Sequence, residues 1–196
     1  IDILVAGVDC GAAAEAAAAI PGVGKVLSAD NAVYGNQLAE NVALLIADVA
    51  AGYDNGDVKL FDLKTNCLRW DTNLGNGVCG LEFDRTDINM NKLVVTTLES
   101  KFHVYDLKTY HPERGYTGLS ELAHKSTIWG VRHFPQNRDL FSTLGGNGHL
   151  NIYKYHYPQN RSLKDENDLP IGVVGRVELL NEKKIAEQPI VSVDWN

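Results

Sequence analysis

The histidines are the side chains in this chain best suited to metal or acid–base chemistry. They are His103, His111, His124, His133, His149 and His156. No two of them share metal-ligand spacing with a cysteine, and each falls at a different point of the local pattern. We therefore expect no metal site.

The cysteines, Cys10, Cys67 and Cys79, are odd in number and show no paired spacing. Such usage fits a reducing compartment better than a disulfide framework. Cys79 has apolar neighbours on a strand-like segment, so we expect it to be buried as a small hydrophobic side chain. Cys10 follows Asp9 with no base nearby in sequence, which leaves a nucleophile unsupported.

A pair of aspartates and a set of glycines could suggest catalysis or phosphate binding, but their sequence context does not support either. Asp54 and Asp57 lie in a turn, where carboxylates cap free backbone N–H groups, so we interpret them as turn formers rather than a catalytic pair. Gly7, Gly11, Gly22 and Gly24 could suggest a phosphate-binding loop. No Lys and Ser/Thr pair follows Gly11, and the later two glycines follow a helix-like run. We expect no catalytic residue.

The turn at residues 54–57 opens a unit that the chain repeats. Residues 58–63 (VKLFDL) alternate in polarity, and the pattern returns in 101–109 (KFHVYDLKT) and 148–155 (GHLNIYKY). Units that recur every ~45 residues, with a glycine-rich turn and an alternating strand, are typical of β-propeller blades. The expected structural positions of the blades include Asp54, Asp57, Phe61, Asp62, Tyr105, Asp106 and Tyr153.

Period-two alternation and regular turns predict strands throughout the rest of the chain. The predicted strands are 58–63, 67–72, 78–83, 92–98, 102–107, 117–122, 128–134, 140–144, 150–155, 176–180 and 190–195. At four per blade they make slightly fewer than three blades, whereas closed propellers use ~4 to 8. We expect an incomplete ring with two uncovered faces. The polar insertion at 158–170 is expected to be an exposed loop.

Residues 1–50 follow a different pattern. An apolar run at 1–6 predicts a buried parallel strand, 12–20 an alanine-rich helix and 25–29 a second strand. Helical spacing over 38–49 predicts a second helix, and we favour that helix over a strand at 46–51. The fold class is therefore mainly β: a partial propeller at 51–196, preceded by a strand-helix-strand-helix α/β segment at 1–50.

Composition limits the partners. The net charge of −7 disfavours nucleic acid, because phosphate binding needs a basic stripe. Apolar stretches fall short of the ~18 residues of a membrane helix, so we expect no membrane span. The chain begins at Ile1 and ends at Asn196 inside a strand-like run, so both ends are expected to be cut from longer sequence.

Residues 51–196 resemble the WD-repeat dynein axonemal assembly factors, adaptors of a RuvB-like and prefoldin-like co-chaperone complex. The resemblance rests on AGYDNGDVKLFDL (51–63), NGVCGLEFDRTDINMNKLV (76–94), KFHVYDLKT, AHKSTIWGVRHFPQNRDLF (123–141) and QPIVSVDW (188–195). It implies that His124 is the structural histidine of a WD repeat, which hydrogen-bonds inward. The matched blades are later ones of that family's ring.

Residues 1–50 are similar to the N-terminus of the electron transfer flavoprotein alpha subunit, through ILVAGVDC and PGVGKVLSADNAVYGNQLAENVALLIADVA. That family binds FAD in a C-terminal domain with no match here, so no flavin-contacting residue carries over. The two resemblances join near Val49 and Ala50. The sequence leaves open whether the join arose in the gene, in its prediction or by design.

A partner surface is the remaining functional expectation. Tyr153, Tyr155 and Tyr157 alternate on one face, and with Trp70 and Trp129 they could contact a partner; core packing stays open. The leading hypothesis is a non-catalytic, cytoplasmic scaffold without cofactor, contacting RuvB-like ATPases and prefoldin-like chaperone components through the 158–170 insertion and open strand edges. The alternatives are an FAD-carrying electron transfer subunit of the mitochondrial matrix, or a fused product with no unitary function.

Overall fold

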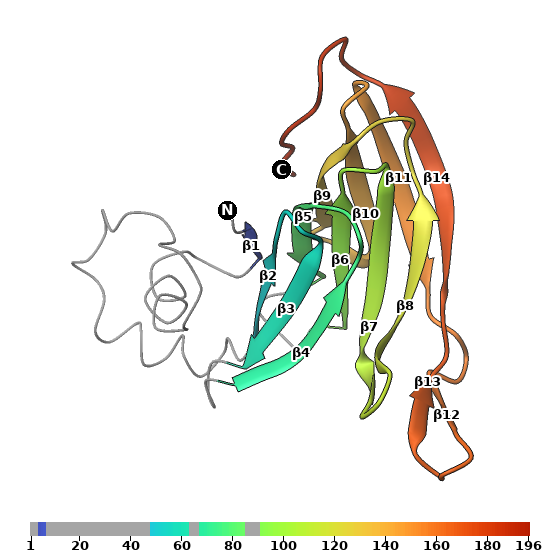
Figure 1. The fold of residues 1–196 in the computed structure, drawn as a ribbon. Helices are drawn as coiled ribbons and strands as arrows, with labels where there is room; N and C mark the ends of the chain where they lie inside the picture. Colours follow the sequence, from blue (N-terminus) through green and yellow to red (C-terminus); the bar gives the residue numbers. More distant parts are fainter. Residues whose placement is uncertain (1–3, 7–47, 63–66, 85–90) are drawn as a thin grey trace, which may run out of the picture.

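The computed structural model describes residues 4–6, 48–62, 67–84 and 91–196. Within these ranges it contains strands and no helix, arranged as three four-stranded antiparallel sheets and one two-stranded hairpin (Figure 1). We call the three larger sheets blades 1, 2 and 3 in chain order. The expected helix at 12–20, the strand at 25–29, the glycines from Gly7 to Gly24 and Cys10 lie outside the described residues.

Blade 1 draws its strands from both sequence patterns. Its strands are β1 (Leu4–Ala6), β2 (Asp48–Gly52), β3 (Asp57–Asp62) and β4 (Cys67–Asn73), hydrogen-bonded in that order. The first strand pairs antiparallel with β2, so the predicted parallel strand is wrong in its direction. A strand from the N-terminal segment therefore completes a blade whose other strands follow the repeat.

The predicted helix over 46–51 is also wrong where the structure describes it. Residues 48–52 form β2, which is hydrogen-bonded to β1 on one side and β3 on the other. Val49, Ala50 and Ala51 are buried there. Pairing on both edges gives the backbone N–H and C=O groups of β2 the hydrogen bonds that a helix would have formed internally. The neighbouring strands therefore override the local helical spacing of the sequence.

Blades 2 and 3 follow the repeat directly. Blade 2 consists of β5 (Val78–Phe83), β6 (Lys92–Thr97), β7 (Lys101–His111) and β8 (Gly115–Leu122). Blade 3 consists of β9 (Ile128–Phe134), β10 (Asn137–Gly145), β11 (His149–His156) and β14 (Arg176–Lys184). The predicted strands between 58 and 180 are all present, with some boundaries longer than expected.

The predicted strand at 190–195 is not formed. This segment is irregular and lies against blade 3, where the Trp195 ring stacks on Phe134 with centroids 4.0 Å apart. The Ile190 N–H donates to the Gly145 carbonyl at 3.3 Å. A strand needs a paired neighbour, and although the segment passes β9, it forms no ladder with any described strand.

The 158–170 insertion is more ordered than the expected loop. It carries the hairpin β12 (Ser162–Lys164) and β13 (Pro170–Gly172), which docks on the far end of β7. Arg161 forms a two-point ion pair with the fully buried Asp106, and His111 Nε2 lies 3.1 Å from Asp165 Oδ2. The hairpin thus connects blade 3 to the outer side of blade 2.

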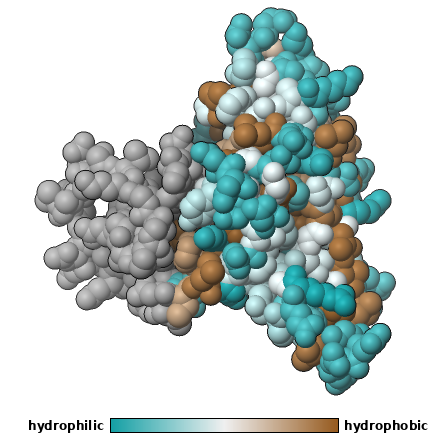
Figure 2. All heavy atoms as spheres, in the orientation of Figure 1, coloured by the Kyte–Doolittle hydropathy of each residue, from teal (hydrophilic) through white to brown (hydrophobic). Residues whose placement is uncertain are grey.

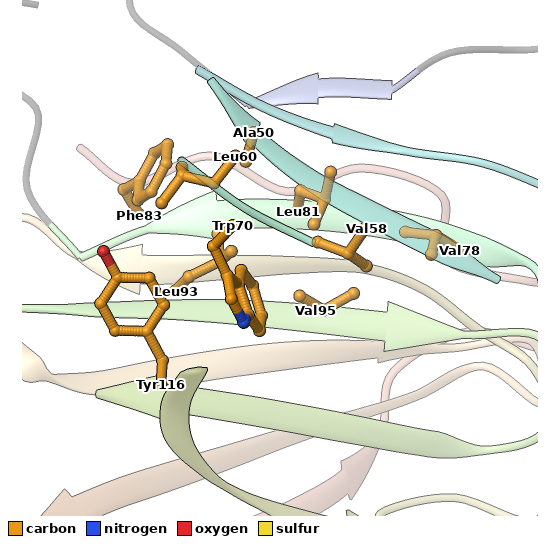
Figure 3. Packing of buried hydrophobic residues seen from close by; sticks show 10 residues of the cluster. All are labelled: Ala50, Val58, Leu60, Trp70, Val78, Leu81, Phe83, Leu93, Val95 and Tyr116. Atoms are coloured by element: carbon orange, nitrogen blue, oxygen red, sulfur yellow. The ribbon is translucent and has the colours of Figure 1, made fainter. Parts of the chain in front are cut away.

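Apolar side chains fill the two spaces between blades. Between blades 1 and 2 the buried cluster includes Ala50, Val58, Leu60, Trp70, Val78, Leu81, Phe83, Leu93, Val95 and Tyr116 (Figure 3). Between blades 2 and 3 it includes Val94, Phe102, Val104, Ile128, Val131, Phe141, Tyr153 and Tyr155. Leu93 and Val94 are neighbours on β6 yet face different blades, so β6 is buried on both faces. Stacking therefore supplies the core.

A charged network crosses from blade 2 to blade 3. Arg138 Nε donates to Asp84 Oδ2 at 2.9 Å, and the fully buried Lys92 Nζ lies 3.6 Å from the same oxygen. Lys92 also donates to the Arg138 carbonyl. Burial lowers the pKa of Lys92 to about 8, against the attraction of Asp84. At Asp84 burial acts to raise the pKa, but the Arg138 hydrogen bond and the Lys92 charge together hold it below its usual value.

We expect Asp84→Asn to destabilise the protein by roughly 3 kcal/mol at pH 7, because it leaves Lys92 buried without its counter-charge. A carboxylate whose pKa is lowered on folding stabilises above its unfolded pKa of ~4, and the contribution disappears as pH falls through the folded pKa. Urea unfolding at pH 7 and near pH 3 measures both effects.

The exposed Asp168→Asn serves as the control, since Asp168 forms its ion pair with the equally exposed Lys164 and surface pairs contribute little. Equal stability losses for the two variants at pH 7 would contradict the proposed role of Asp84.

Candidate protein-interaction groove

A cavity opens where the outer strand of blade 1 approaches the outer half of blade 2. It has a volume of about 560 Å³ and is lined by residues of β4, β7, β8 and the turn between β7 and β8. Cavities of ~300–1,000 Å³ are typical of ligand and peptide sites. β4 and β8 are the terminal strands of their sheets within the described residues. We call the cavity the β4–β8 groove.

The groove is lined by a continuous series of rings. The Trp70 indole makes edge contacts with Tyr105 at 4.9 Å and with Tyr116 at 5.3 Å between ring centroids. Tyr116 in turn contacts Tyr110 at 5.2 Å. Figure 3 shows Trp70 of blade 1 beside Tyr116 of blade 2. Trp70 and Tyr116 are buried, whereas Tyr110 is 44% exposed. The inner rings therefore form a floor and Tyr110 the accessible end.

Two glycines of β8 allow these rings to lie against its backbone. A Cβ on Gly115 would lie 2.3 Å from Trp70 Nε1, and one on Gly118 would lie 2.6 Å from the Tyr105 ring. Gly115 also has a φ of 68°, in the left-handed region that favours glycine. Gly115 is therefore required twice: for the left-handed backbone conformation of the turn and for the space that the Trp70 ring occupies.

The buried floor of the groove is uncharged, and the positive and negative side chains of its lining are equal in number. Burial lowers the pKa of His103, with Lys101 adding to the effect, so the imidazole is neutral at pH 7. Burial likewise raises the pKa of Tyr105. The charged lining residues are Asp71, Glu113, Arg69 and Arg114, two of each sign. The inner rings of the groove are buried, so Tyr110 is the ring that its lining exposes, beside charged residues of both signs.

The residues predicted for partner contact are not brought together. Trp70 forms the groove floor and is only 9% exposed. Tyr155 and Tyr157 make an edge contact at 4.8 Å, and Tyr155 is buried between blades 2 and 3. Tyr155 and Tyr157 therefore serve core packing, the alternative to partner binding that the sequence left open. Trp129 lies on the innermost strand of blade 3 and is 41% exposed, remote from the groove lining.

The expected blade positions lie in or beside the blades. His124 is buried before β9, with Nε2 2.8 Å from Thr143 Oγ1, and burial lowers its pKa. This contact supports a structural role for it. Tyr153 is buried and its hydroxyl accepts from Asn151 Nδ2 at 3.2 Å. Phe61 is buried on β3, and Asp62 ends that strand.

The turn before β3 differs in detail from the expectation. Asn55, rather than an aspartate, accepts the free backbone N–H, from Asp57 at 3.1 Å. The Asp57 carboxylate instead accepts amide hydrogens from Asn73 at 2.6 Å and Asn55 at 3.0 Å, which lower its pKa. Asp54 is exposed in the same turn, and it is the Asp57 carboxylate that links the turn to β4.

The sequence pattern did not single out Tyr110 and Tyr116. They pair across the β7–β8 ladder, on either side of the turn that holds Pro112 and Gly115. The available signal was the symmetric spacing of two tyrosines around a proline- and glycine-containing turn in YHPERGY.

The histidines each have a local contact. His111, His133, His149 and His156 lie within 3.2 Å of a carboxylate oxygen of Asp165, Glu82, Glu182 and Glu178 respectively. Within the described ranges there is no group of three or more His, Cys, Asp or Glu side chains that could hold a metal ion.

Cys79 is half-buried rather than fully buried, and burial raises the pKa of its thiol to about 11. The part of the chain that the structure describes contains no helix long and apolar enough to cross a membrane.

A second candidate surface follows the outer edge of blade 3 and its hairpin. Figure 2 shows hydrophobic side chains among polar ones along this edge. The exposed apolar residues there are Leu163, Leu169, Val174, Leu179 and Leu180, each between 38% and 55% exposed. Groups of exposed apolar side chains commonly mark interaction sites. This edge includes the insertion that the sequence predicted as a contact.

Comparison with curated proteins gives a consistent assignment for most of the chain. It is 60% identical over 148 residues to dynein axonemal assembly factor 10 of Xenopus tropicalis and to that of Homo sapiens, which covers 76% of this chain. Identity to the Chlamydomonas reinhardtii protein is 50% over 164 residues, or 83% of this chain. The chain spans only 41–45% of the length of these relatives. The predicted resemblance to this family is confirmed.

A shorter stretch matches a second protein: 55 residues, 28% of the chain, are 56% identical to the electron transfer flavoprotein subunit alpha of Pseudomonas aeruginosa and cover 18% of it. No family model matches the chain. Among solved structures, Saccharomyces cerevisiae Sqt1 is similar with a TM-score of 0.53 and 14% identity, over 74% of this chain and 34% of that one. The WD40 repeats of RRP9 are also similar, with a TM-score of 0.45, 17% identity and coverage of 54% and 30%. The three stacked four-stranded blades, together with the similarity to Sqt1, identify the fold as an incomplete WD-repeat propeller.

We expect Gly115→Ala to destabilise the protein more than Gly75→Ala. Both glycines have positive φ, so both variants acquire backbone strain of ~1–2 kcal/mol, but a Cβ at Gly75 meets nothing within 4 Å. The excess at Gly115, about 1–3 kcal/mol for overpacking, measures the contact with Trp70. Urea unfolding followed by tryptophan emission tests this, and equal losses would show that the ring does not lie against β8.

Proposed function

We propose that this chain is a non-catalytic protein-interaction module that acts in the assembly of axonemal dyneins. The observation that carries the proposal is the 60% identity over 148 residues to dynein axonemal assembly factor 10. The described residues form three stacked blades, whose buried apolar side chains are occupied in packing one blade on another.

The chemistry of the described surface supports a binding role. The candidate acid–base side chains are taken up by structural contacts: Asp57 by two asparagines, His124 by Thr143, and Asp106 by Arg161. What the surface offers instead is an aromatic groove and an exposed apolar edge. We propose that it works in the cytoplasm without a cofactor, and that its partners are RuvB-like ATPases and prefoldin-like chaperone components.

Co-precipitation tests the proposed partners. We expect the tagged chain to enrich RuvB-like ATPases from a ciliated-cell lysate, and the hairpin variant Leu163→Asp to lower that enrichment, because a charge interrupts the exposed apolar edge. The matched control is Leu122→Asp, which changes an even more exposed leucine at the end of β8. Recovery no higher than that of an unrelated tagged propeller would refute these partners.

The match to the electron transfer flavoprotein subunit raises electron transfer with FAD as an alternative function. We propose that residues 1–50 and 51–196 have different origins. The match covers 18% of that subunit, so we propose that residues 1–50 do not bind FAD by themselves. We expect the purified chain, incubated with FAD and desalted, to show no visible flavin absorption. Stoichiometric retained flavin would favour the electron-transfer alternative.

A further inference from the structure

We propose that the β12–β13 hairpin is a strap: docking on blade 2 keeps it folded, and so holds in place the apolar surface that it offers to a partner. The part of this inference that concerns a partner rests on the proposed interaction function. The hairpin consists of two three-residue strands and is closed by a hydrogen bond from the Val173 N–H to the Arg161 carbonyl. We call residues 161–173 the strap. An isolated two-stranded hairpin is marginally stable in water, so the order of the strap depends on its contacts with blade 2.

The first attachment is a buried ion pair. Arg161 Nε donates to Asp106 Oδ2 at 3.0 Å and its Nη2 donates to Oδ1, so the guanidinium holds the carboxylate at two points. Asp106 lies on β7 and is fully buried, and the Tyr157 ring centroid lies 4.4 Å from Arg161 Cζ. Two-point, charge-assisted hydrogen bonds are stronger and more directional than neutral ones. This pair therefore fixes the base of the strap.

A second attachment lies at the turn of the strap. The buried His111 accepts the N–H groups of Glu113 and Arg114 at Nδ1, at 3.1 and 3.3 Å. Its Nε2 therefore carries the hydrogen and donates it to Asp165 Oδ2 at 3.1 Å. The other oxygen of Asp165 accepts the Leu169 N–H at 2.9 Å. One carboxylate thus closes the turn of the strap and joins it to blade 2.

Between these attachments the strap lies directly against β7 and β8. A Cβ on Gly172 would lie 2.5 Å from Thr109 Cβ and 2.1 Å from Thr117 Oγ1. Thr109 is buried at this contact. Polar and small residues therefore make the contact with blade 2 at the base, middle and turn of the strap.

The apolar side chains of the strap are not used for this docking. Leu163 is 55% exposed and Leu169 is 38% exposed, and Val174, just beyond the strap, is 51% exposed. A hairpin held only by packing would turn such side chains inward, because their burial is favourable. Exposed apolar groups of this kind commonly mark interaction sites. The strap thus offers an apolar surface to the protein partner of the proposed function, and its polar contacts hold that surface in place.

Hydrogen exchange measured by mass spectrometry on the whole chain tests the strap. We expect Asp106→Asn to raise the exchange rate of the amides in residues 161–173 by about tenfold or more, because the Arg161 charge loses its partner and the hairpin opens locally. Asparagine keeps the size of aspartate and an oxygen for the Lys108 N–H. The amides of β6, in the same blade, should therefore keep their protection.

Lys164→Gln is the matched control, since it removes an exposed ion pair with Asp168 inside the strap and should leave exchange unchanged. Gly172→Ala leaves Asp106 intact and pushes the middle of the strap away from β7, so we expect faster exchange over the same amides. The inference is overturned if Asp106→Asn and Lys164→Gln give equal rates, or if Gly172→Ala leaves the strap protected.

Co-precipitation separates the strap from the proposed partners. Gly172→Ala should lower the enrichment of RuvB-like ATPases, as Leu163→Asp does, because a loosened strap no longer holds its apolar surface in place. Faster exchange with unchanged enrichment would show that docking of the strap does not serve this partner. If the unaltered chain enriches no RuvB-like ATPase, the proposed partners are wrong, and faster exchange in the two variants still establishes the strap.

Discussion

The structure depends on one constraint: a four-stranded blade has two faces, and each inner face must be covered by another blade. Blade 2 meets this constraint on both sides. Leu93 and Val95 on β6 pack toward blade 1, and Val94 between them packs toward blade 3. All three are fully buried. Burial on both faces explains why β6 carries three consecutive apolar residues, Leu93 to Val95, rather than alternating ones.

Apolar stacking alone does not determine how two blades are aligned, and the charged contacts add that information. Glu82, Asp84 and Asp106 of blade 2 each accept hydrogen bonds from the chain that follows it: Arg132 and His133, Arg138, and Arg161. In these contacts the acids belong to blade 2, and the bases belong to blade 3 or, for Arg161, to the segment just before the β12–β13 hairpin. Charge-assisted hydrogen bonds are directional, so a displaced blade would leave several buried charges unpaired.

The groove follows from the same stacking. Blades arranged side by side twist and separate toward their outer strands, so apolar contact weakens there. Between blades 1 and 2 this widening space is bordered by Trp70 and three tyrosines, while between blades 2 and 3 the β12–β13 hairpin occupies the outer side. The first outer space is therefore a cavity among the described residues, whereas the hairpin fills the second.

The sequence by itself determined the repeating strands, because alternation and turn residues are local properties: the segments at 58–62, 78–83 and 128–134 are strands as predicted. It did not determine which strand completes blade 1. The 41 residues 7–47 separate β1 from β2 along the chain, and the two strands meet only through antiparallel pairing. Nor did it reveal the groove. Trp70 and Tyr116 meet only when blades stack, so their contact, and the loss of a strand at 190–195, were decided by tertiary neighbours rather than by local pattern.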